Sequence, residues 1–129
     1  MKRGFTLIEA LIVLTLIGIL VSILVPQYRS SVIRAKEAVL KENLFQMRDA
    51  INKFYTDKKK YPTSLEELAA NRYLRDVPVD PFTKNKEWEL IHAEPGEEED
   101  YDPEIHEGIV DVKSRAKGVA LDGSTYTQW

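Results

Sequence analysis

The hydrophobic pattern of the chain changes once, near residue 26. Nearly every position from Phe5 to Val25 is apolar, and the one charged residue in this run is Glu9. As a helix the run measures roughly 31 Å, which matches the ~30 Å hydrocarbon core of a bilayer. Lys2 and Arg3 precede it, and the positive-inside rule places that end in the cytoplasm. The pattern therefore predicts a transmembrane helix over residues 5–25 and an exported domain over residues 26–129.

A cleaved secretory signal peptide is the alternative interpretation, since it also has a basic start and an apolar centre. The apolar run here is longer than the centre of a usual signal peptide. It is also not followed by the small-x-small residues of a cleavage site, because the sequence there is Val21-Ser22-Ile23-Leu24-Val25-Pro26. These two features favour an anchor that stays in the membrane.

After Pro26 the pattern becomes amphipathic. Apolar residues recur every three, four or seven positions, with charged residues between them, which predicts a helix to about Tyr55. The apolar positions are Ile33, Leu40, Leu44, Met47, Ile51 and Phe54, and the charged ones include Arg34, Lys36, Glu37, Lys41, Glu42 and Arg48. Joined to the anchor, this helix makes a rod of roughly 50 residues, or ~75 Å. Because proline cannot donate to the helical ladder, we expect a kink or a loosened turn at Pro26.

The rest of the chain predicts one short helix and a small sheet. Thr63 or Ser64 can cap a helix that carries Leu65, Leu68 and Ala69 on one face. The segments 88–91 and 108–112 alternate between apolar and polar residues, as paired strands do. The predicted fold class is therefore α+β, with a long N-terminal helix packed on a small C-terminal antiparallel sheet.

Two charged segments could be taken for binding sites, but their sequences favour solvated surface segments. The segment Glu94 to Glu104 is mostly acidic and is flanked by His92 and His106, yet consecutive carboxylates cannot all face one metal ion. Its composition predicts a solvated loop. The three lysines 58–60 favour the solvated end of a helix over a phosphate site, because the helix dipole attracts cations there.

Composition narrows the possible functions. The formal net charge is −3, and loss of Lys2 and Arg3 would leave −5, so the exported surface has no basic footprint for nucleic acid. Cysteine is absent, which leaves packing, neighbouring subunits or a bound ion to stabilise the domain. We also find no glycine-rich phosphate loop and no nucleophile elbow. The sequence therefore predicts a structural protein and not an enzyme.

The N-terminus resembles a known processing signal. Gly4-Phe5-Thr6-Leu7-Ile8-Glu9 is similar to the class III signal sequence of type IV pilins and type II secretion pseudopilins. The resemblance implies that prepilin peptidase removes residues 1–4, that Phe5 becomes N-methylated, and that Glu9 pairs with this amine on a neighbouring subunit. An ionised carboxylate in an apolar span costs about 2.5–3.5 kcal/mol on insertion scales, so Glu9 needs such a partner.

A second resemblance covers the globular part. Lys60-Tyr61-Pro62-Thr63, Leu65-Glu66-Glu67-Leu68, Tyr73-Leu74 and Pro78-Val79-Asp80-Pro81-Phe82 are similar to the major pseudopilin of type II secretion systems. Together with the N-terminus, this resemblance covers residues 1–92. Type IV pilus major pilins typically carry a cysteine pair near the C-terminus, and this chain has no cysteine.

The resemblance also implies a function, a location and partners. It implies a homopolymer that is stored in the bacterial inner membrane and assembles into a periplasmic filament, with an assembly ATPase, an inner-membrane platform and minor pseudopilins as partners. Such a filament pushes exoproteins through an outer-membrane secretin. The alternative is a minor pilin that binds DNA, a surface or a redox partner. The acidic charge and the small number of tyrosines in the domain disfavour that alternative.

The resemblance finally implies a Ca²⁺ ion in the C-terminal loop, bound by two aspartates and backbone oxygens. Asp122 matches the first aspartate, but no carboxylate in residues 124–129 matches the second. Because Ca²⁺ takes six to eight oxygens and binds more weakly as charged ligands are lost, we expect at best a weak site. We expect Tyr126, Trp129 and the Asp-Gly turn to hold this loop by packing instead.

Overall fold

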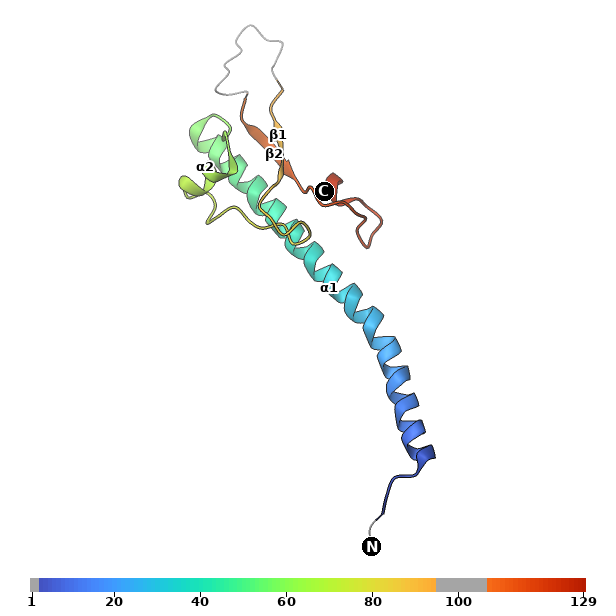
Figure 1. Cartoon of the computed structure of the whole chain (residues 1–129). Helices are drawn as coiled ribbons and strands as arrows, with labels where there is room; N and C mark the ends of the chain where they lie inside the picture. The colour runs from blue at the N-terminus through green and yellow to red at the C-terminus, as the bar shows by residue number, and fades with distance from the viewer. Residues whose placement is uncertain (1–2, 95–106) are drawn as a thin grey trace. The chain divides into compact units, whose positions relative to one another are not determined.

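A computed structural model describes residues 3–94 and 107–129. The chain forms two units, Met1–Ala35 and Lys36–Trp129. Its elements in order are α1 (Leu7–Lys58), α2 (Leu65–Ala70), β1 (Glu89–His92), β2 (Ile109–Lys113) and the short 3₁₀ helix η1 (Tyr126–Gln128), most of which are labelled in Figure 1. Helix α1 begins in the first unit and ends in the second, and each unit is described by itself below.

The first unit consists mainly of the apolar start of α1. This helix contains a window with mean hydropathy 2.8, long and apolar enough to cross a membrane, and none of that window is buried in the chain. Pro26 lies inside α1, so the proline does not end the helix. This agrees with the predicted continuity of the rod, and the kink at Pro26 remains a prediction.

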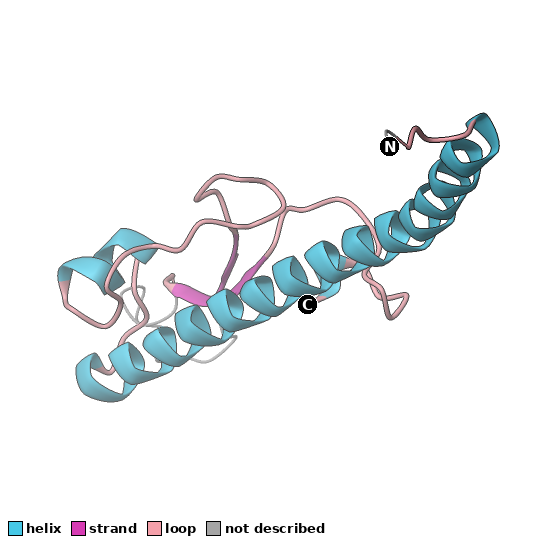
Figure 2. Ribbon diagram, turned by 90° about the horizontal axis from the view of Figure 1, so that it is seen from below, coloured by secondary structure: helices cyan, strands magenta, loops and turns pink. Residues whose placement is uncertain are grey.

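The second unit has its own hydrophobic core. The amphipathic stripe of α1 supplies Leu40, Leu44, Met47, Ile51 and Phe54, which are buried as the sequence predicted. Ile33, the first residue of the predicted stripe, belongs to the first unit and is only half-buried. Figure 2 shows α2 and the two strands beside this part of α1. They contribute the remaining core side chains, among them Leu65, Leu68, Ile109 and Val112. Helix α1 ends at Lys58, three residues beyond the predicted end.

Helix α2 begins where the sequence predicted, and the structure decides between its two candidate caps. Ser64 is the N-cap residue, and its hydroxyl accepts a hydrogen bond from the Glu67 amide. The Glu67 carboxylate in turn accepts from the amide and the hydroxyl of Thr63. Reciprocal bonding of this kind satisfies backbone donors that a short helix cannot satisfy by itself.

The sheet is one antiparallel pair, as predicted, although both strands start one residue later than expected. Glu89 pairs with Lys113 and Ile91 with Asp111, and the register shifts between Ile91 and His92. The observed long helix and small antiparallel sheet confirm the α+β pilin-like fold class. The predicted acidic loop lies outside the described residues from position 95 onward, and so does His106.

Candidate processing and assembly site

The Gly4–Phe5 junction lies before α1, in residues without regular secondary structure. Phe5 is 85% exposed, and a Cβ built on Gly4 meets no atom within 4 Å. Because the helix begins only at Leu7, the peptide bond after Gly4 is not held in a helical hydrogen-bond ladder.

Thr6 caps the first turn of α1, which the sequence interpretation missed. Its hydroxyl accepts a hydrogen bond from the Glu9 amide at 3.2 Å, and its carbonyl accepts from the Ala10 amide at 3.1 Å. Thr6 and Glu9 have the spacing of a capping box, in which the acid sits at the third helical position. Glu9 therefore has a structural role available to it besides pairing with an amine. The Thr-x-x-Glu spacing was the signal that could have revealed this role.

The structure brings the predicted processing and assembly residues together. Arg3, Gly4, Phe5 and Glu9 line one open cavity of about 300 Å³. Within residues 3–94 and 107–129, Glu9 takes part in none of the salt bridges, which join other side chains.

The electrostatics of a helix start favour the same pairing. The N-terminus of a helix carries a partial positive charge, so a carboxylate in the first turn is stabilised there and an ammonium is destabilised. Glu9 is the acid in the first turn of α1. Cleavage after Gly4 would create an ammonium at Phe5, two residues before the helix. A carboxylate partner would offset the unfavourable position of that charge.

Asp122, the predicted calcium ligand, bonds to its own turn. One oxygen, Oδ1, accepts hydrogen bonds from the Ser124 hydroxyl at 2.6 Å and from the Ser124 amide at 2.9 Å. These bonds from Ser124, and to a smaller degree the charge of Lys41, lower the pKa of Asp122. Gly123 follows with a positive φ of 89°, which glycine adopts without strain, so the predicted Asp-Gly turn is confirmed.

Glu37 is a residue that sequence reasoning placed wrongly. It was assigned to the charged face of the helix, but it is only 9% exposed. Its Oε1 accepts hydrogen bonds from the Tyr126 hydroxyl and the Leu121 amide, each at 2.9 Å. Burial of the phenol, together with the Glu37 hydrogen bond, raises the pKa of Tyr126 to about 12. Glu37 thus connects α1 to a loop more than eighty residues away.

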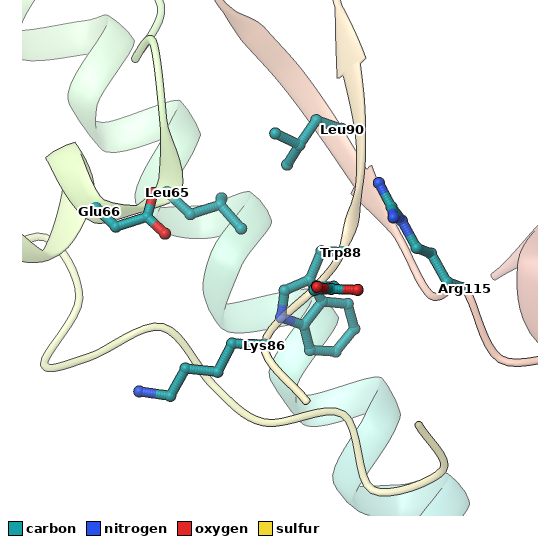
Figure 3. A pocket seen from close by; sticks show the side chains of 7 residues that line it. Leu65, Glu66, Lys86, Trp88, Leu90 and Arg115 are labelled. Atoms are coloured by element: carbon teal, nitrogen blue, oxygen red, sulfur yellow. The ribbon is translucent and has the colours of Figure 1, made fainter. Parts of the chain in front are cut away.

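A further open pocket, of about 280 Å³, lies between α2 and the strands (Figure 3). Leu65, Trp88 and Leu90 form its apolar part, and the charged side chains at its rim are Glu66, Lys86, Glu87 and Arg115. The Trp88 indole donates to the Pro78 carbonyl, so this side chain is fixed by the fold. The lining residues include no serine, cysteine or histidine that could act as a nucleophile or base.

Comparison with known proteins identifies relatives for both parts of the chain. Residues 1–25 match the family model described as the prokaryotic N-terminal methylation motif. The chain is 29% identical to type II secretion system core protein G of Escherichia coli (strain K12) over 117 residues, which cover 78% of each chain. It is 32% identical to core protein G of Pseudomonas aeruginosa over 97 residues, covering 63% of this chain and 68% of that protein.

A type IV pilin also matches, over a shorter part. The type IV major pilin protein PilA of Myxococcus xanthus (strain DK1622) is 37% identical over 77 residues, covering 56% of this chain and 35% of that protein. The names of these relatives denote pilins and secretion-system core proteins rather than enzymes. No solved structure matches the chain.

The long helix, the small sheet and the N-terminal methylation motif define a pilin-like protein of the pseudopilin type. Within that class, the chain belongs to the family of type II secretion system core protein G. This result agrees with the resemblance found in the sequence.

Proposed function

We propose that this chain is the structural subunit of a type II secretion pseudopilus, a homopolymer that supports protein export. In this proposal the subunit is stored in the bacterial inner membrane as a single-pass protein with its N-terminus in the cytoplasm. Prepilin peptidase removes residues 1–4, and an assembly ATPase, a membrane platform and minor pseudopilins take part in polymerisation. Membership in the core protein G family supports the proposal.

One observation carries the assembly role. Glu9 is the one charged residue in the apolar segment from Phe5 to Val25, and it lines the same cavity as Gly4 and Phe5. A buried charge that loses its partner is strongly destabilising, so a carboxylate in lipid selects for a cationic partner. The N-methylated amine of Phe5 on a neighbouring subunit supplies that cation in the proposal.

Processing can be tested by intact-mass spectrometry of protein taken from membranes. We expect a mature chain that starts at Phe5 and carries one added methyl group. Gly4→Val is the matched control, because the open space around Gly4 accepts a larger side chain without strain in the chain itself. That variant should keep residues 1–4. An assembled protein that retains Met1 to Gly4 in the wild type contradicts the proposal.

Assembly can be tested with two substitutions of Glu9. Glu9→Val removes both the charge and the polar side chain at the capping-box position, whereas Glu9→Gln keeps a residue type suited to that position and removes only the charge. We expect both variants to insert into the membrane and both to lose most filament yield in a sheared-fraction immunoblot. Wild-type yield with Glu9→Gln would show that Glu9 acts only as a helix cap.

A further inference from the structure

The loop from Gly118 to Trp129 has an ordered backbone of its own. Val119 and Thr125 form an isolated antiparallel bridge, and the Ala120 amide donates to the Ser124 carbonyl at 2.6 Å. The Trp129 indole donates to the Ser124 hydroxyl at 2.6 Å. Aromatic packing adds to this, because the Tyr126 ring stacks on Phe82 with 4.3 Å between centroids.

Three charged residues of α1 reach this loop from one stripe of the helix. Glu37, Lys41 and Arg48 lie four and seven residues apart, and at ~100° per residue they fall within about 40° of one another. Glu37 accepts from the Leu121 amide and the Tyr126 hydroxyl. Arg48 donates from Nη2 to the main-chain oxygen of Trp129 at 2.6 Å, and Lys41 Nζ lies 4.5 Å from the centroid of the Trp129 ring.

Arg48 also fixes β2 to the same helix. Its Nε lies 2.7 Å from the Asp111 carboxylate, and its Nη2 donates to the Val112 carbonyl at 3.0 Å. A planar guanidinium with several donors can bond to a carboxylate and to carbonyls at once, which an ammonium cannot do as rigidly. The loop and the sheet therefore share one anchor on α1.

The donor set in this loop does not fit the calcium ion that the resemblance implies. Ca²⁺ takes six to eight oxygen ligands, usually with several carboxylates. Asp122 Oδ1 already accepts two hydrogen bonds from Ser124. In the part of the chain that the structure describes, no group of three or more Asp, Glu or His side chains could hold a metal ion. Cations are nevertheless present at the loop, as the side chains of Lys41 and Arg48.

We propose that Glu37, Lys41 and Arg48 of α1 fix the loop 118–129 in place of a calcium ion, so that the order of this loop is independent of Ca²⁺. The two cations supply the positive charge that an ion would supply, and Glu37 accepts from a backbone amide and a phenol. This inference concerns the folded subunit and is independent of whether the subunit forms filaments.

Hydrogen–deuterium exchange of the full chain in detergent tests the proposal before any assembly. The readout is the exchange rate of peptides from residues 118–129, with the β2 peptide as the internal reference. We expect the wild-type loop to exchange at the same rate in millimolar CaCl₂ and in excess EDTA. Faster exchange in EDTA that CaCl₂ reverses would overturn the proposal, because it would show a metal-dependent loop.

Substitutions then test the contact that Glu37 makes with the loop. Glu37→Ala should speed exchange of the loop by roughly ten- to a hundredfold, the change expected when hydrogen bonds to a charged group are lost. CaCl₂ should not restore it. Tyr126→Phe, which keeps the ring, should produce a smaller change in the same direction, and Glu37→Gln should restore part of the protection because its carbonyl still accepts.

Glu42→Ala is the matched control on the same helix. Glu42 is exposed, and its carboxylate accepts from the Gln46 amide side chain, one turn away. We expect this variant to exchange as the wild type does throughout residues 118–129. If Glu37→Ala and Glu42→Ala are indistinguishable in the loop while β2 stays protected, the proposed role of Glu37 is wrong.

Discussion

The units Met1–Ala35 and Lys36–Trp129 share one helix and contain similar apolar residues, but they bury them differently. In the first unit, the large apolar side chains from Leu7 to Val25 are all exposed, and even the least exposed of them, Val25, is 46% accessible. In the second unit, Leu40, Met47 and Ile51 on the same helix are fully buried. The difference does not arise from helix propensity, because both segments are helical.

The apolar side chains of the two units therefore suit two different surroundings, a protein core in the second unit and an apolar environment outside the chain in the first. Burial of apolar surface contributes about 25 cal/mol per Å², but only where other atoms exclude water. The second unit supplies those atoms itself, from α2, the strands and the C-terminal loop. The first unit leaves an apolar surface of the kind that lipid or other subunits cover, so its sequence is explained by a partner and not by the fold of a single chain.

A substitution in the core of the second unit should destabilise the protein far more than one in the apolar span of the first unit. Phe54 is 1% exposed and packs edge-to-face on Tyr73, so Phe54→Ala should lower the free energy of unfolding by about 3–5 kcal/mol. Leu16→Ala, in the exposed span, should change it by less than about 0.5 kcal/mol. Urea titration in detergent can follow Trp88 and Trp129 fluorescence, since both tryptophans lie in the second unit. Equal losses for the two variants would show that the span contributes to the domain.

Sequence reasoning found the parts of the fold that have a periodic or local signal. The stripe Leu40 to Phe54 was predicted because its spacing is that of one helix face. The roles of Gly4, Phe5 and Glu9 come from the resemblance of residues 4–9 to a pilin signal sequence, and they stay predictions. The strand ends were each one residue off, because backbone hydrogen bonds and the shift at Ile91 fix the register, and hydropathy does not.

The charged residues whose contacts the sequence did not reveal have partners far away in the sequence. Glu37 and Tyr126 are 89 positions apart, and Arg48 and Trp129 are 81 apart. Asp80 is fully buried and accepts hydrogen bonds from the Phe82 amide and from Ser114, 34 residues later. From a single sequence each of these charged residues fits a solvated face, because nothing local reveals its partner. The packing of the chain on itself supplies that information.

An intermediate effect concerns the link between α1 and the C-terminal loop. Tyr126→Phe should cost about 1.5–3 kcal/mol at neutral pH, the value of a hydrogen bond to a charged group. The folded pKa of Tyr126, about 12, exceeds the ordinary value of 10.0. The stabilisation is therefore fully present below pH 10 and is lost as the pH rises towards 12.

The stability difference between the wild type and Tyr126→Phe should accordingly narrow between pH 10 and pH 12. Urea titrations at several alkaline pH values would measure it, with Tyr28→Phe as the control, because Tyr28 is 71% exposed in the first unit. If the difference in the free energy of unfolding between the two proteins stays constant across this range, the pKa of the Tyr126 phenol is the same in the folded and unfolded states.

Charged residues of α1 that face solvent should contribute much less to the free energy of unfolding than those that contact the C-terminal loop. Lys53 pairs with Asp49 at 2.7 Å, but its side chain is 65% exposed, and exposed i,i+4 pairs contribute only about 0.3–0.5 kcal/mol. Lys53→Ala should therefore change the free energy of unfolding by less than about 0.5 kcal/mol, partly because alanine is the better helix former. High salt should remove the ion-pair part of this difference, since at 1 M the Debye length is about 3 Å. If Lys53→Ala lowers the free energy of unfolding by more than about 1 kcal/mol in high salt as well, Lys53 makes a stabilising contact besides its ion pair with Asp49.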